Sequence, residues 1–69
     1  MTEIKEYTES TQVRMIEYRD GHMEVTFISG AKYRYHNVSK EVWEQALAAE
    51  SIGRFLNSEI KHKHKYEKI

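Results

Sequence analysis

The 69-residue sequence contains no cysteine and no proline. Without cysteine there is no disulfide and no thiolate metal site, so disulfide-stabilised small proteins are excluded and a reducing compartment is expected. The sequence also lacks any apolar run near the ~20 residues of a membrane span, and its first residues lack the apolar segment of a signal peptide. We therefore expect a single soluble domain in the cytoplasm.

Net charge is absent as well, because 11 Lys and Arg balance 11 Asp and Glu. A neutral domain lacks the strong positive field that is typical of nucleic-acid-binding proteins. The charges are nevertheless unevenly placed, since acids predominate in residues 1–24 and bases in residues 54–69. Such polarity fits charge complementarity within the molecule, and it also fits a basic patch for an anionic partner.

Residues 1–10 are mostly polar and predict a flexible N-terminal arm ahead of one domain over residues 11–69. Within that domain, Asp20-Gly21 separates two runs of β-branched and aromatic residues. This dipeptide suits a type I′ turn, which needs positive φ at both positions, so we predict a hairpin whose strands share one apolar face.

A third strand is predicted over residues 31–38, after a turn at Ser29-Gly30. Its register has two alternatives. With a two-residue turn, Tyr33 and Tyr35 both point away from the apolar face. With one residue more in the loop, as in a bulged hairpin, Tyr33 lies opposite Phe27 and both tyrosines face the core.

Two short helices are predicted after the strands. Ser39 is a good N-cap for the first, in which Trp43 is an expected core anchor, and Ser51 is a good N-cap for the second. Gly53 is unfavourable inside a helix, so we expect it to permit close packing or the approach of a partner. The predicted fold is therefore α+β, a three-stranded antiparallel meander followed by two short helices packed on one sheet face.

Catalytic and metal-binding constellations are absent from the sequence. His62 and His64 are two residues apart and would share a strand face, but His22 and His36 lie on separate elements. No cysteine or close carboxylate cluster completes the three or four ligands that zinc needs. The sequence has no nucleophile motif, paired carboxylates or glycine-rich phosphate loop, so we expect no metal, no cofactor and no enzyme activity.

The stretch Lys32-Tyr33-Arg34-Tyr35-His36 interleaves aromatic rings with cations, and a basic run follows over residues 61–68. Single-stranded nucleic-acid binders use such strands, because bases stack on the rings and phosphates pair with Lys or Arg. In the alternative interpretation, the tyrosines fill the core and the cations are solvated strand residues.

The order of motifs along the chain resembles the KTSC domain. The residues that carry the resemblance are Ile16-Glu17-Tyr18, Met23-Glu24-Val25-Thr26-Phe27, Gly30, Tyr33-Arg34-Tyr35, Val38, Ser51-Ile52-Gly53-Arg54-Phe55-Leu56-Asn57, Ile60-Lys61, Tyr66 and Ile69. The Tyr-x-Tyr hallmark of that domain is matched by Tyr33 and Tyr35, whereas its usual proline after the central valine is replaced by Ser39. The domain takes its name from the C-terminus of some lysyl-tRNA synthetases and also occurs as small bacterial and phage proteins. The resemblance thus implies RNA binding by analogy with that attachment.

We expect a small non-catalytic module that binds RNA or single-stranded nucleic acid. Asn57 would read a base edge or cap the second helix, and the rings would be chiefly structural, with Arg34 and the basic tail contacting the partner. The expected contact residues are Lys32, Tyr33, Arg34, Tyr35, Arg54, Asn57, Lys61, Lys63 and Lys65. The alternative is a protein-interaction module, such as a phage or bacterial factor that docks on a host protein or self-associates through an exposed edge of the third predicted strand.

Overall fold

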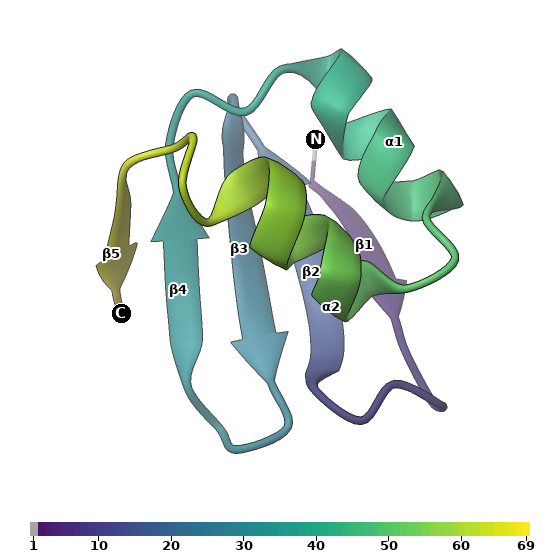
Figure 1. The fold of residues 1–69 in the computed structure, drawn as a ribbon. Coiled ribbons are helices and arrows are strands. Elements are labelled where there is room, and N and C mark those ends of the chain that lie inside the picture. The colour runs from purple at the N-terminus through teal and green to yellow at the C-terminus, as the bar shows by residue number, and fades with distance from the viewer. Residues whose placement is uncertain (1) are drawn as a thin grey trace.

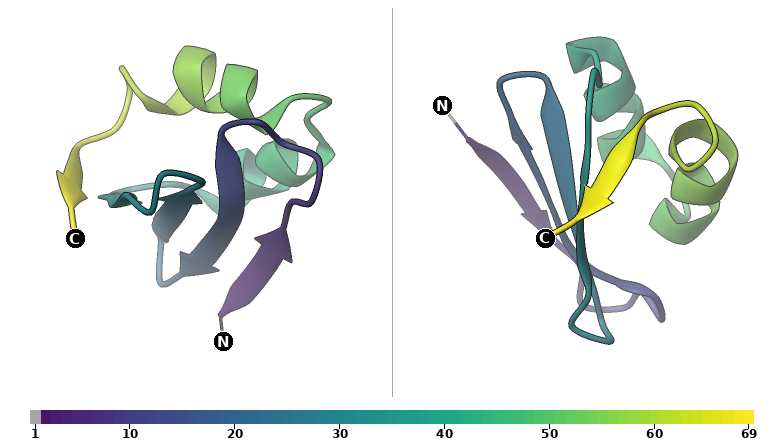
Figure 2. Two further views of the ribbon diagram at one scale, coloured as in Figure 1. Left: turned by 90° about the horizontal axis from the view of Figure 1, so that it is seen from below. Right: turned by 90° about the vertical axis from the view of Figure 1, so that its left-hand side faces the viewer.

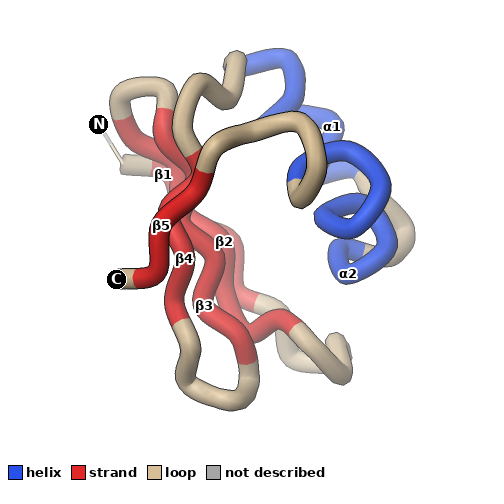
Figure 3. Tube along the Cα trace, turned by 60° about the vertical axis from the view of Figure 1, so that its left-hand side comes forward, coloured by secondary structure: helices blue, strands red, loops and turns tan. Residues whose placement is uncertain are grey.

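A five-stranded antiparallel sheet with two helices on one face makes up the computed structural model, which describes residues 2–69 (Figure 1). The elements are β1 (Glu3–Glu6), β2 (Val13–Arg19), β3 (His22–Phe27), β4 (Lys32–Tyr35), α1 (Lys40–Ala48), α2 (Ile52–Phe55), a π-helical turn η1 (Leu56–Ile60) that continues α2, and β5 (Tyr66–Lys68). Neighbouring strands in the sheet follow chain order, from β1 at one edge to β5 at the other. Figures 2 and 3 show the sheet as one layer and the helices as a second.

The predicted α+β class is confirmed, but the predicted three-stranded sheet is wrong. Two short strands flank the predicted meander. β1 lies within the residues predicted as an N-terminal arm and pairs with β2, and β5 pairs with β4. The predicted exposed edge of the third strand is therefore wrong, because β5 covers it. Both strands lie at a sheet edge and have only four and three residues, so neither gives a clear alternating pattern in the sequence.

The first hairpin forms as predicted. Asp20 and Gly21 have φ of 50° and 79°, as a type I′ turn requires, and Ile16 pairs with Val25. The register shifts further along the hairpin, between Val13 and Met15. This bulge lets Val13 and Ile16, three residues apart, both face the core with no exposed surface.

The second hairpin settles the direction of the tyrosine rings. The backbone N–H of Phe27 donates to the carbonyl of Ala31, which leaves a loop of Ile28, Ser29 and Gly30, and Gly30 has φ of 96°. The longer loop of the second alternative is therefore present. Tyr33 pairs with Val25 rather than with Phe27, however, because the additional loop residue is Ile28.

The helices begin where their caps were predicted. Ser39 Oγ accepts from the N–H of Val42 at 3.2 Å, and Ser51 Oγ accepts from the N–H of Arg54 at 3.4 Å. Trp43 is fully buried and stacks on Tyr18, with ring centroids 5.3 Å apart, so its role as a core anchor is confirmed.

The buried core consists of Val13, Ile16, Met23, Val25, Tyr35, Val38, Trp43, Ala46, Ile52, Leu56 and Ile60. No helix among residues 2–69 is long and apolar enough to cross a membrane.

Candidate functional site: an aromatic cleft beside the second helix

The interleaved rings and cations of β4 lie on opposite faces of the sheet. Successive strand residues point to opposite faces, so Tyr33 and Tyr35 face the helices while Lys32 and Arg34 face the open side. The sequence prediction treated these residues as one binding strand. The structure divides them between two surfaces.

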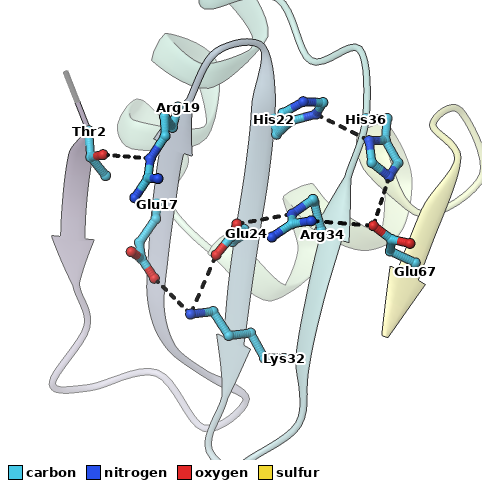
Figure 4. Close-up of polar contacts among 9 residues, drawn as sticks. All are labelled: Thr2, Glu17, Arg19, His22, Glu24, Lys32, Arg34, His36 and Glu67. Carbon is cyan, nitrogen blue, oxygen red and sulfur yellow. Dashed lines mark hydrogen bonds and ion pairs between the residues drawn. The ribbon is translucent and has the colours of Figure 1, made fainter. Parts of the chain in front are cut away.

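The open face holds Lys32 and Arg34 in ion pairs with acids of the neighbouring strands (Figure 4). Lys32 Nζ lies 3.4 Å from both Glu17 and Glu24. Arg34 Nε lies 3.1 Å from Glu24 Oε2, and its Nη1 lies 3.5 Å from Glu67 Oε1. Partial burial raises the pKa of Glu24, but the hydrogen bonds from Arg34 and Lys32 together outweigh it and hold that pKa below its usual value. Both cations are thus neutralised within the sheet.

The helix-facing side carries a cleft of about 520 Å³ between β4, β5 and the second helix. The residues lining it are Gln12, Phe27, Tyr33, Tyr35, Gly53, Leu56, Asn57, Lys61 and Tyr66. Tyr33 is central, with its ring centroid 5.7 Å from those of Phe27 and Tyr66, both in edge-to-face contact. The ring centroid of Tyr35 lies 5.5 Å from that of Tyr66. The four rings therefore form one contiguous aromatic surface.

Exposure increases from the inner end of this cleft to its rim. Tyr35 is only 5% exposed, and burial, together with the neighbouring Tyr66 and Tyr33, raises the pKa of its hydroxyl. Tyr66 is 53% exposed, on the edge strand β5. The hydroxyl of Tyr35 thus stays protonated at neutral pH, and its buried ring forms one side of the cleft. The ring of Tyr66 is accessible to a ligand.

Besides the tyrosine hydroxyls, the polar side chains of the cleft are two carboxamides, Gln12 and Asn57, and one cation, Lys61. Asn57 and Lys61 both line it, and no acid of the described chain does. Lys68 pairs with Tyr33 across β4 and β5, which places it on the same sheet face as Tyr33, although it does not line the cleft. The cleft therefore presents aromatic rings, amide groups and positive charge.

The remaining predicted contact residues lie further away. Lys63 Nζ contacts Glu59 at 3.4 Å, and Lys65 supplies a backbone carbonyl that accepts from the N–H of His36. Arg54 is exposed and lines a neighbouring hollow. The structure therefore brings Tyr33, Tyr35, Asn57 and Lys61 together and separates them from Lys32, Arg34, Arg54, Lys63 and Lys65.

Sequence reasoning missed Phe27, Tyr66, Gln12 and Lys68 as site residues. The signal for Tyr66 is the alternation of the last residues, which indicated that this ring could dock back on the domain. For Gln12 the only sequence signal is indirect, namely the glycine at position 53, which permits Gln12 to pack close to the helix. A Cβ at that glycine would lie 2.5 Å from Gln12 Oε1, so the prediction of a close approach at Gly53 is confirmed.

A second hollow of about 580 Å³ lies on the other side of the Gln12–Gly53 contact, between residues 5–12 and residues 49–54. The hydroxyl of Tyr7 is buried without a hydrogen-bond partner among the described residues, and burial raises its pKa. Acids and bases both line this hollow, so it lacks the uniform character of the aromatic cleft.

Comparison with known proteins decides the family. The KTSC domain model matches residues 9–66, which include every residue that lines the cleft. The chain belongs to the KTSC domain family. The crystal structure of a KTSC domain protein from Yersinia pestis superposes with a TM-score of 0.88 and 26% sequence identity, covering 100% of this chain and 99% of that one.

Two curated relatives are similar over part of their length. A protein of Tsukamurella paurometabola is 51% identical over 35 residues, which cover 51% of this chain and 52% of the relative. An uncharacterised protein of Stutzerimonas stutzeri is 48% identical over 42 residues, which cover 61% and 59%. The aligned part of the chain thus spans between half and three fifths of the curated relatives' length.

Proposed function

We propose that this KTSC domain protein binds single-stranded nucleic acid, RNA in particular, in the aromatic cleft. The observation that carries the proposal is the composition of the cleft, with four contiguous aromatic rings, two carboxamides, one cation and no acid among its described lining residues. Its volume of about 520 Å³ falls in the range of small-ligand sites. Single-strand binders combine aromatic stacking surfaces with cations for the phosphates in the same way.

In this proposal the exposed ring of Tyr66 is the main stacking surface. Stacking of one base on an aromatic side chain contributes about 1–3 kcal/mol. The carboxamide of Asn57 offers both a donor and an acceptor, which suits the edge of an unpaired base. Tyr33 and Tyr35 hold the cleft open from the sheet side rather than stacking themselves, since Tyr35 is buried.

Phosphate contacts would come from the cations nearest the cleft, Lys61 after η1 and Lys68 on β5. Arg54 on α2 would supply a third contact at a greater distance from the cleft. Lys32 and Arg34 have no part in this surface, because they lie on the opposite sheet face in ion pairs. With zero net charge, the protein lacks a long-range attraction for nucleic acid, so binding should be weak and confined to low salt.

The test is a fluorescence anisotropy titration with labelled single-stranded RNA and with tRNA, at about 50 mM and about 200 mM salt. Three phosphate contacts on a single strand lower affinity about 20-fold over this range. Tyr66→Ala should lose about 5- to 150-fold in affinity. Lys61→Ala should weaken binding and flatten the salt dependence, whereas the matched charge removal Lys32→Ala, on the open face, should change neither. Absence of binding at the lower salt, or equal losses for Lys61→Ala and Lys32→Ala, would refute the proposal.

A second candidate function is docking on a protein or on another copy of the chain. The sheet has two outer strands, β1 and β5, and Ile4 and Ile69 beside these edges are 57% and 49% exposed. Unpaired strand edges with exposed apolar side chains favour strand addition by a partner. Light scattering combined with a pull-down from bacterial lysate tests this, and a strict monomer that retains no protein would contradict it.

A further inference from the structure

Two histidines face each other at one end of the open sheet face, outside the aromatic cleft (Figure 4). His22 begins β3, and His36 directly follows β4, so the pairing of Met23 with Tyr35 makes them the next pair along the hairpin. Their Nδ1 atoms are 3.1 Å apart, and the rings meet edge to face at 86°. The sequence alone places these residues on separate elements. The hairpin register brings them together.

We propose that His22 and His36 chelate a divalent transition-metal ion through their two Nδ1 atoms. Metal–imidazole bonds of about 2.0–2.1 Å place two nitrogen ligands about 2.9 Å apart at a right angle and about 3.4 Å apart at the tetrahedral angle. The observed separation of 3.1 Å lies between these values. A metal ion can therefore enter between the rings with little movement of the backbone.

A carboxylate orients one of the two ligands. His36 Nε2 lies 3.4 Å from Glu67 Oε1, which favours the tautomer with its proton on Nε2 and leaves the Nδ1 lone pair free. Glu67 is held in turn by Arg34 Nη1 at 3.5 Å. Metal-binding histidines commonly have this arrangement, in which a carboxylate accepts from the second ring nitrogen and fixes the orientation of the ring.

The second ligand needs only a change of tautomer. With the proton of His36 on Nε2, its Nδ1 can only accept, so Nδ1 of His22 carries the proton of the 3.1 Å contact. Metal binding requires that proton on Nε2 of His22 instead, which leaves the ring neutral and exposes the Nδ1 lone pair.

The ion has two protein ligands and completes its coordination with water. No third His, Cys, Asp or Glu joins the pair anywhere in residues 2–69. The nearby cations are engaged elsewhere, since Arg19 Nε donates to Thr2 Oγ1 at 2.9 Å and Arg34 contacts Glu24 and Glu67. Imidazole ligands in the absence of thiolate favour Cu²⁺ over Ni²⁺ and Zn²⁺.

His62 and His64 provide an internal comparison. The sequence predicted that they share a strand face, but they lie in the turn between η1 and β5. His64 Nδ1 lies 3.1 Å from the carbonyl oxygen of His36, and His62 is exposed. This second pair therefore lacks the facing nitrogens of the first.

Isothermal titration of the tag-free protein with Ni²⁺ and with Cu²⁺ tests the proposal. His22→Gln and His36→Gln should each lower affinity at least tenfold, and Glu67→Gln should lower it about tenfold. His62→Gln is the matched control and should leave affinity unchanged. Circular dichroism of each variant checks folding, and the Cu²⁺ electron paramagnetic resonance spectrum should show two nitrogen ligands. Failure of the wild type to bind either ion, or loss on His62→Gln without loss on His22→Gln, would overturn the proposal.

Discussion

Glu24 lies at the centre of the ion pairs on the open sheet face, and removing its charge tests how much those pairs stabilise the fold. It contacts Arg34 at 3.1 Å and Lys32 at 3.4 Å, and these cations are 37% and 36% exposed. Pairs with partners this exposed are screened by solvent, and each contributes about 0.2–1 kcal/mol. Glu24→Gln should therefore lower the free energy of unfolding by about 1 kcal/mol, or Tm by about 4–8 °C.

The effect has a pH dependence with a definite sign. The folded-state pKa of Glu24 is held below its usual value of 4.5, so the folded protein binds this proton less readily than the unfolded chain. The resulting stabilisation is fully present above the unfolded-state pKa and is lost as pH falls through the folded-state pKa. The difference between wild type and Glu24→Gln should thus be full at about pH 7 and should shrink below about pH 4.5.

Urea unfolding of both proteins at about pH 7 and about pH 4 measures this difference. About 1 M salt should also reduce it at neutral pH, because the screening length falls to about 3 Å. Glu50→Gln is a suitable control, since Glu50 is exposed and has no ion pair among the described residues. Its effect should stay within about 0.5 kcal/mol. An equal difference at both pH values, or no difference at pH 7, would refute the reasoning.

Three further substitutions, two of them with a matched control, test the packing and the turns by the same urea measurements. Trp43→Ala, at a fully buried position, should cost about 3–5 kcal/mol, and Trp43→Phe should cost clearly less. Tyr18→Phe removes the hydroxyl that donates to the carbonyl of Val38 at 2.7 Å and should cost about 1–2 kcal/mol. Gly30→Ala should cost about 1–2 kcal/mol through its φ of 96° alone, because a Cβ there meets no atom within 4 Å, whereas Ser29→Ala should be nearly neutral.

Local chemistry explains which elements could be predicted from the sequence. The turn at Asp20-Gly21 and the caps at Ser39 and Ser51 depend only on their own backbone, so they were predictable. β1 was not, because its helix-facing residues are Glu3 and Lys5 and no apolar alternation marks it. These charged side chains find partners far along the chain.

Those partners show why β1 needs its tertiary context. Lys5 Nζ donates to the carbonyl of Leu47 at 2.9 Å, and Glu3 accepts from Trp43 Nε1 at 3.2 Å. The hydrogen bond from Lys40, and that from Trp43, lower the pKa of Glu3. Each contact spans about 40 residues of sequence, so no local pattern indicates it. The strand is specified by the helix that covers it.

The candidate site was predictable only in part, for a related reason. The alternation of Tyr33 and Tyr35 was evident, but their direction depended on whether the loop before them has two residues or three, and Gly30 fits either loop. Tyr66 joins the same aromatic surface through β5 pairing, which depends on contacts more than 30 residues apart. Asn57 and Lys61 became cleft residues only once the second helix lay across the sheet.

The separation of rings and cations on β4 has a consequence for any ligand. Successive residues of β4 point to opposite faces of the sheet, so Tyr33 and Arg34 lie on different surfaces. One ligand therefore cannot stack on Tyr33 and pair with Arg34 at the same time. An Arg34 substitution that weakens binding would therefore act through the ion pairs with Glu24 and Glu67, and it would lower stability in parallel. A substitution at Lys61 or Tyr66 would weaken binding without that loss. The ratio of binding loss to stability loss thus distinguishes a ligand in the cleft from one on the open face, even before its chemical identity is known.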